Sequence, residues 1–98
     1  MPAPLSFTLL PTWSADTGRP HDYVFRCGGI DVGRCYLRTM GGGEHRWHWT
    51  IYIGTHVAKV VEGVPVVGDE ETLEKAKSAF RGSFESMIKA GVVRLSTP

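Results

Sequence analysis

Cysteine and histidine are the residue types in this sequence that could bind a metal or supply a nucleophile and a base. His45 and His48 lie three residues apart in a segment that alternates like a β-strand, so their side chains should point to opposite faces. A zinc site needs three or four converging ligands, and no spacing here provides them. The other members of the set are Cys27, Cys35, His21 and His56. We therefore predict no metal and no other cofactor.

The two thiols are predicted to be structural. In the hairpin described below, Cys27 pairs with Ile30, which places Cys35 about 17 Å away at about 3.4 Å per residue. A disulfide needs α-carbons within about 7 Å, so we expect two buried, reduced thiols. A nucleophile–base pair of Cys35 with His48 is disfavoured because the two residues should lie on opposite faces of the sheet. The sequence has no nucleophile elbow, phosphate-binding loop or zinc-protease helix, and we predict that the protein is not an enzyme.

Arginine and aromatic side chains give the strongest indication of a binding surface. On a sheet such residues can hold phosphates and stack on bases, and the same types are enriched at protein–protein interfaces. The third alternative is a solvated face whose arginines form weak ion pairs with Asp31 or Glu44. The residues of this predicted binding face are Arg26, Arg34, Tyr36, Arg38, Arg46, His48 and Tyr52.

A tight hairpin should position the first of these residues. Segments 21–27 and 30–40 are rich in strand-forming residues, and the Gly28-Gly29 pair between them is typical of a two-residue turn. This turn pairs Cys27 with Ile30 and Phe25 with Val32. All four side chains would then lie on one face.

The outward direction of the arginines depends on a β-bulge. Beyond Val32, strict alternation would bury Arg34, so we predict an extra residue at Gly33. The bulge continues the apolar face through Cys35, Leu37 and Thr39. It also turns Arg34, Tyr36 and Arg38 to the opposite face.

A third strand over 45–53 follows a glycine-rich loop. Its apolar residues alternate with polar ones, which predicts one buried and one outward face. A short edge strand over 5–10 is also indicated, because Pro11 cannot donate to a β-ladder. Residues 14–20 have the composition of a turn. The predicted buried residues of the third strand are Trp47, Trp49, Ile51 and Ile53.

One amphipathic helix over 72–90 should cover the buried face of the sheet. Thr72 is the predicted N-cap and Gly91 fits the left-handed C-cap position. Segment 54–68 is either a loop or an edge strand. The fold class is therefore α+β, a two-layer structure with an antiparallel sheet of three to four strands. The apolar helix positions, three and four apart, are Leu73, Ala76, Phe80, Phe84, Met87 and Ile88.

Length and charge limit the remaining options. The 98 residues suit one domain, residues 1–98, with a partly irregular segment over 1–20. Eleven basic and ten acidic side chains give a formal charge of +1, which argues against a general binder of nucleic acid or anionic membrane. No secretory signal and no apolar run of about 20 residues is present, so we expect a cytoplasmic location.

Three motifs resemble those of a group of small bacterial proteins of no established function. Their pattern is a Gly-Arg-(aliphatic)-Tyr strand, a Trp-x-Trp strand and a helix that opens Thr-Leu-x-x-Ala-Lys. Here the corresponding residues are Gly33-Arg34-Cys35-Tyr36, Trp47-His48-Trp49 and Thr72 to Lys77, within a match over about 21–88. Cys35 stands where the pattern has an aliphatic residue, which implies a core role for that position. The resemblance implies no active site.

The sequence predicts a small, non-catalytic protein-interaction module. Its partner would be another protein or a second copy of the chain, bound through the open sheet face. The alternative is a nucleic-acid-binding domain that uses the same face, because three strands followed by a helix also resembles the sheet-type DNA-binding domains of some integrases and plant transcription factors. Neither a membrane nor a small-molecule partner is indicated.

Overall fold

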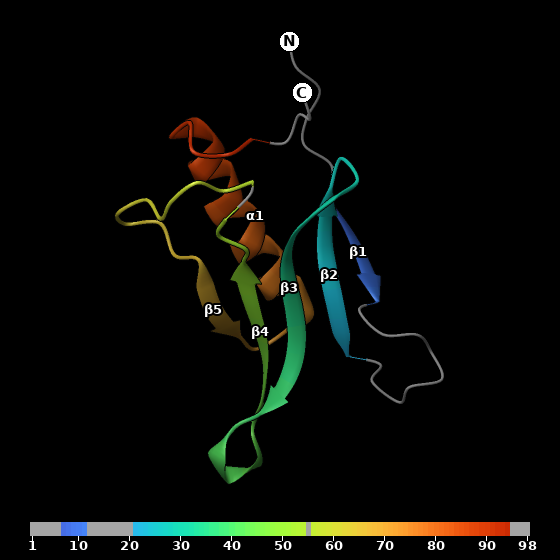
Figure 1. The fold of residues 1–98 in the computed structure, drawn as a ribbon. Helices are drawn as coiled ribbons and strands as arrows, with labels where there is room; N and C mark the ends of the chain where they lie inside the picture. The colour runs from blue at the N-terminus through green and yellow to red at the C-terminus, as the bar shows by residue number, and fades with distance from the viewer. Residues whose placement is uncertain (1–6, 12–20, 55, 95–98) are drawn as a thin grey trace.

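The protein forms one antiparallel sheet with one helix packed on it. The computed structural model describes residues 7–11, 21–54 and 56–94. The sheet has five strands in the order β1-β2-β3-β4-β5, and α1 lies across one of its faces (Figure 1). This confirms the predicted α+β class, with a strand count slightly higher than the expected three to four. The strands are β1 (Phe7–Pro11), β2 (Asp22–Cys27), β3 (Ile30–Thr39), β4 (His45–Ile51) and β5 (Val67–Glu70), and the helix is α1 (Leu73–Lys89).

The N-terminal edge strand is present. β1 pairs antiparallel with β2, with Phe7 opposite Cys27 and Leu9 opposite Phe25. The first residues of the predicted strand, together with the predicted turn segment 14–20, lie outside the described residues. Proline is tolerated at the end of β1 because this strand is at the edge of the sheet.

The β2–β3 hairpin confirms the predicted turn and corrects one detail of its register. Gly28 and Gly29 both have positive φ, at 60° and 82°, as a two-residue turn of this type requires. Cys27 pairs with Ile30 as predicted, but Phe25 lies opposite Gly33 and not opposite Val32. The register shifts between Phe25 and Arg26, so the extra residue of the bulge is Val32.

Gly33 lies on the buried face of the sheet, at a position where no larger residue fits. A β-carbon at this position would come within 2.3 Å of a Phe80 ring atom and 2.4 Å of the Thr50 carbonyl oxygen. Phe25 and Phe80 stack with their ring centroids 3.9 Å apart. The glycine therefore lets the helix ring lie directly against the sheet.

The C-terminal half of the sheet differs from the prediction in two places. β4 ends at Ile51, and Ile53 beyond it is 43% exposed, so the expectation that Ile53 is buried was wrong. Segment 54–68 is mostly loop, and its last two residues begin β5, which pairs with β4 through Val67–Thr50 and Gly68–Trp49. Strand β5 is the fifth strand that the sequence did not resolve.

The helix and its core are as predicted. The Thr72 side chain accepts a hydrogen bond from the Lys75 backbone N–H at 3.1 Å, and Gly91 has a φ of 78° just past the helix. Four of the predicted apolar positions are fully buried, and Leu73 and Ile88 are partly buried against them. The fully buried helix residues are Ala76, Phe80, Phe84 and Met87.

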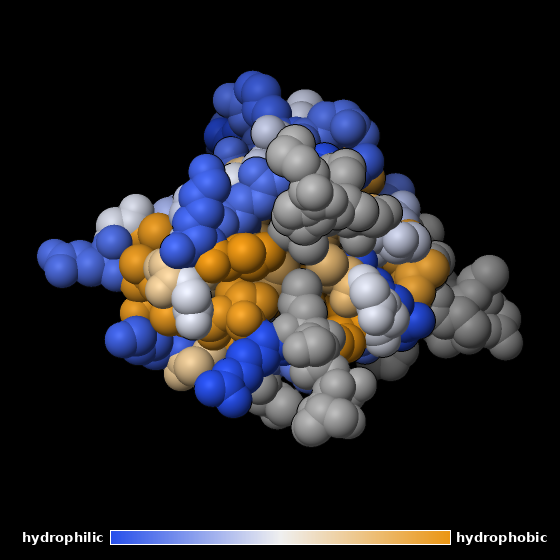
Figure 2. All heavy atoms as spheres, turned by 90° about the horizontal axis from the view of Figure 1, so that it is seen from above, coloured by the Kyte–Doolittle hydropathy of each residue, from blue (hydrophilic) through white to orange (hydrophobic). Residues whose placement is uncertain are grey.

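The loop after β4 is tied to the C-terminal segment. Val57 is fully buried and forms an isolated β-bridge with Val93, supported by a hydrogen bond of 2.9 Å from Ala58 N–H to the Val92 carbonyl. Seen from the end of the molecule at which α1 finishes, apolar side chains form a band between charged ones (Figure 2). Within the described part of the chain, α1 lacks the length and the hydrophobicity that a bilayer span requires.

Candidate interaction surface

The face of the sheet opposite α1, here called the outward face, carries the predicted binding residues. Strand register places Arg34 beside Thr50, Tyr36 beside His48 and Arg38 beside Arg46 on this face. Val24 joins them because it pairs with Arg34, and Val67 because it pairs with Thr50. Tyr52 follows in the same alternation beyond the end of β4. The bulge in β3 thus turns the arginines away from the helix, as the sequence predicted.

Arg34 is bound to a carboxylate that sequence reasoning missed. Its Nε donates to Asp22 Oδ1 at 2.9 Å, and its Nη2 contacts Asp22 Oδ2, so the pair is bidentate. The guanidinium carbon lies 4.9 Å from the centroid of the Tyr36 ring. The hydrogen bond with Asp22 raises the pKa of Arg34 above its ordinary value. Asp22 is only 8% exposed, which makes this the most buried ion pair of the face.

Asp69 of β5 holds a second cluster. It accepts from Arg38 Nη2 at 3.1 Å through one oxygen and contacts His48 Nδ1 at 3.0 Å through the other. The His48 ring is also 5.3 Å from the Tyr36 ring, centroid to centroid. The Nε of Arg38 is buried and has no hydrogen-bond partner in the described structure. Asp69 thus connects the predicted residues of β3 and β4 to β5.

The other two arginines pair with carboxylates nearer in the sequence. Arg26 Nε lies 2.8 Å from Asp31 Oδ1, while Arg46 lies 3.4 Å from Glu44 and 3.8 Å from Glu71. All four arginines of the predicted face therefore have a carboxylate partner. The sequence named Asp31 and Glu44 as ion-pair partners, and these two pair with Arg26 and Arg46. The partners of Arg34 and Arg38 are instead Asp22 and Asp69.

Tyr52 is the most peripheral member of the predicted set. Its side chain is 41% exposed at the end of β4, and partial desolvation raises its pKa, with Arg34 acting in the opposite direction. The backbone N–H of Tyr52 donates to the Val32 carbonyl at 3.0 Å. Tyr52 is therefore held beside the bulge, near Arg34.

Neither thiol shares a face of the sheet with the His48 imidazole. Cys35 and Cys27 are buried, free thiols on the helix side of the sheet, whereas His48 lies on the outward face. Burial raises the pKa of Cys35 from 9.0 to about 12 and also raises that of Cys27. Over residues 7–11, 21–54 and 56–94, no three metal-ligating side chains come together. The geometry therefore offers no activated thiolate for nucleophilic catalysis.

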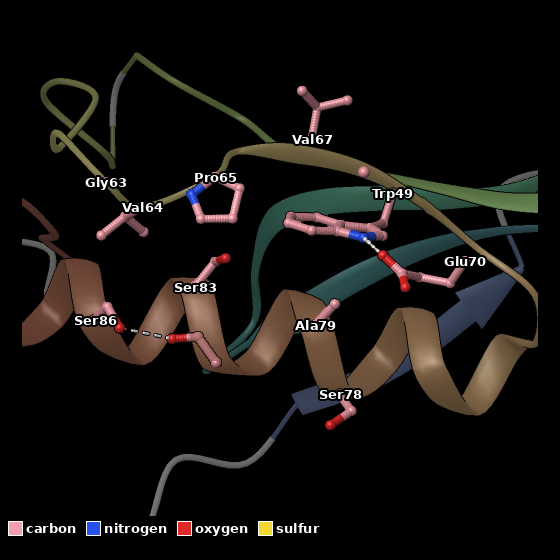
Figure 3. Close-up of a pocket in the computed structure, with 12 residues that line it drawn as sticks. Trp49, Gly63, Val64, Pro65, Val67, Glu70, Ser78, Ala79, Ser83 and Ser86 are labelled. Carbon is pink, nitrogen blue, oxygen red and sulfur yellow. Dashed lines mark hydrogen bonds between the residues drawn. The ribbon is translucent and has the colours of Figure 1, made fainter.

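A groove between β5 and α1 is a feature that the sequence did not indicate. It has a volume of about 450 Å³ and lies between the 63–68 segment and one side of the helix (Figure 3). At one end the Trp49 indole N–H donates to Glu70 Oε2 at 3.1 Å. The signal that could have revealed it is the series of small residues along the helix, Ser78, Ala79, Gly82, Ser83 and Ser86.

Comparison with protein-family models, with curated proteins and with solved structures finds no match for this chain. The resemblance of residues 21–88 to small bacterial proteins therefore stays a prediction.

Proposed function

We propose that this protein is a non-catalytic interaction module that pairs with a second copy of itself through the outward face. The observation that carries the proposal is the mutual neutralisation of the charges on a face that also presents Val24, Tyr36 and Val67. Protein interfaces combine aromatic and arginine side chains with few uncompensated charges at their centre.

Charge pattern favours a second copy as the partner. Arginines and carboxylates alternate over the face, with the Arg34–Asp22 pair on β2 and β3 and the Arg38–Asp69 pair on β3 and β5. In a two-fold dimer each patch meets the equivalent patch, so a face must be complementary to itself. A face with both signs interspersed can meet this requirement, whereas a face of one sign would repel its copy.

The size of the face suits a small interface. Its strands contain 5, 6, 10, 7 and 4 residues, and each residue covers about 16 Å² at roughly 3.4 Å per residue and roughly 4.8 Å strand spacing. The face therefore has a projected area on the order of 500 Å², below the ~800 Å² that each partner buries in an interface of standard size, so we expect a weak dimer.

Nucleic-acid binding through the same face is the weaker alternative. Phosphate contacts would have to replace ion pairs that all four arginines already make. If the four arginines bound phosphates, the log–log salt dependence on duplex DNA should have a slope of about −3.6. A gel-retardation titration at about 50 mM salt tests this, and a shift abolished by replacing Arg34 and Arg38 with alanine would favour the alternative.

Sedimentation velocity over a micromolar concentration series tests the dimer. We expect a concentration-dependent dimer that the substitution Tyr36→Glu abolishes, because it places two like charges near the centre of the interface. Val60→Glu, an apolar-to-acidic change at an exposed loop residue, should leave the dimer unchanged. A wild-type protein that sediments as a monomer at every concentration would contradict the proposal.

A further inference from the structure

The free edge of β5 is the starting point for a second binding surface, separate from the outward face. The Ile51 N–H donates to the Val66 carbonyl at 2.7 Å, which fixes the alternation of the β4–β5 ladder. Residues 66, 68 and 70 therefore direct their backbone groups toward β4. The backbone N–H and C=O groups of Val67 and Asp69 point away from the sheet, where a further strand could pair with them.

The helix beside this edge has a surface of small side chains. Ser78, Gly82 and Ser86 are exposed, and a β-carbon built on Gly82 would meet nothing within 4 Å. All three line the groove (Figure 3). A strand added to β5 would lie about 4.8 Å from it, so its helix-side side chains would enter the space above these residues.

Ser83 is a polar group that points to a ligand. The residue is only 7% exposed, and its side chain faces the groove from α1 (Figure 3). Its hydroxyl has no hydrogen-bond partner among the residues that the structure describes, whereas the neighbouring Ser86 hydroxyl donates to the Gly82 carbonyl at 3.0 Å. The hydroxyl is not among the fully buried atoms that lack a partner, so solvent reaches it from the groove, and a bound group could replace that solvent as its hydrogen-bond partner.

Glu70 supplies the charge of the groove. Its Oε2 accepts from the Trp49 indole at 3.1 Å, and no cationic side chain of the described residues forms an ion pair with it. This contrasts with its neighbours, because Asp69 pairs with Arg38 and Glu71 with Arg46 and Lys75. A half-buried carboxylate without a cation is complementary to a positively charged ligand.

We propose that the groove between β5 and α1 binds an extended, basic peptide segment of a partner protein. The segment adds to the edge of β5 through Val67 and Asp69 and places a Lys or Arg side chain beside Glu70. Its next helix-side residue is small or polar and reaches the Ser83 hydroxyl above Gly82. An extended peptide is the occupant that matches both a free row of backbone groups and a groove beside it that is lined by α1 from Ser78 to Ser86.

Selection from a phage-displayed library of short random peptides tests the proposal. Wild-type protein is the bait, and the Gly82→Leu variant, which fills the groove, is the counter-selection. We expect enriched peptides with one Lys or Arg at a fixed position, and at least about tenfold weaker binding to Glu70→Gln and to Gly82→Leu. Backbone amide signals of Val67 and Asp69 should shift in an NMR titration with an enriched peptide.

A matched control separates groove filling from a general effect of leucine. Glu74→Leu adds a leucine to an exposed position of α1 that does not line the groove, and it should bind the peptides like wild type. Tyr36→Glu should also bind them normally, so failure of the proposed dimer would leave this result unaffected. The proposal is overturned if no peptide is enriched over the Gly82→Leu bait, if enriched peptides lack a basic residue, or if Gly82→Leu abolishes self-association, which would make a second copy the occupant.

Discussion

The guanidinium of Arg34 and the carboxylate of Asp22 form a bidentate ion pair across the β2–β3 hairpin, at the centre of the outward face. The carboxylate is almost fully buried, whereas the arginine side chain is 35% exposed. Removal of the arginine would leave a buried negative charge without this ion pair. The pair therefore links β2 to β3 and neutralises the charge at this point of the surface.

Replacement of Arg34 by methionine should lower the free energy of unfolding by about 2 kcal/mol, less than for a fully buried pair because the arginine is partly solvated. Arg26→Met removes the ion pair with Asp31, whose two side chains are 42% and 49% exposed, and should cost at most about 0.5 kcal/mol. Urea denaturation of both variants measures the difference. Equal losses would show that Asp22 does not depend on Arg34.

Gly33→Ala should be among the most destabilising small substitutions in the protein. The new methyl group would collide with the Phe80 ring and with the Thr50 carbonyl oxygen, and the backbone atom cannot rotate away. We expect a loss of about 3 kcal/mol, measured by urea or thermal denaturation. Gly41→Ala is the control, since a β-carbon there has no atom within 4 Å, and its effect should stay within about 0.5 kcal/mol. Similar stabilities for the two variants would argue against the close packing of Phe80 on β3.

Much of this fold follows from local patterns in the sequence. Alternation identified the two faces of β2, β3 and β4, the Gly28-Gly29 pair identified the turn, and the period of the helix identified its buried side. These patterns act over a few residues, so they can be recognised without knowledge of the tertiary structure. The predicted position of the bulge was wrong by one residue. From the local pattern Val32 and Gly33 could each be the extra residue, and only contact with Phe80 decides between them.

The features that sequence reasoning missed depend on distant partners. β5 has four residues with no clear period, and it pairs with β4 at a point where the Trp49 indole lies against Gly68, so that a β-carbon on Gly68 would come within 2.6 Å of the ring. The partners of the outward arginines, Asp22 and Asp69, lie 12 and 31 residues away from them. The groove likewise exists only once β5 and α1 are packed together.

Cys35 should be unreactive in the native protein. Burial raises its pKa from 9.0 to about 12, which lowers the thiolate fraction at pH 8 on the order of a thousandfold. Ellman's reagent should therefore react far more slowly with the native protein than with the protein unfolded in urea. Rapid labelling of Cys35 in the native state at pH 8 would contradict its buried position.

The same shift has a consequence for stability at high pH. The native state holds the Cys35 proton up to a pKa of about 12, whereas the unfolded state loses it near 9.0, so stability is fully present below pH 9 and decreases as the pH rises toward 12. The urea concentration at the midpoint of unfolding should decrease when the pH is raised from 8 to 10. This fall should be smaller in Cys35→Ala, which lacks the titrating group, and an equal fall in both proteins would assign the effect to other residues.

Gly82→Ala should stabilise the protein, because glycine inside a helix is unfavourable by about 1 kcal/mol relative to alanine and the new methyl group points into open space. The control is Gly91→Ala at the end of the same helix, which also has no atom within 4 Å but has a φ of 78°. There the alanine must adopt a left-handed conformation, so the free energy of unfolding should fall by about 1 kcal/mol. Opposite shifts of the thermal midpoint would show that Gly82 is not required for folding. A glycine that weakens the helix and clears the groove would then be explained by close approach of a ligand, whereas a loss of stability in Gly82→Ala would assign it a structural role and leave the groove without that support.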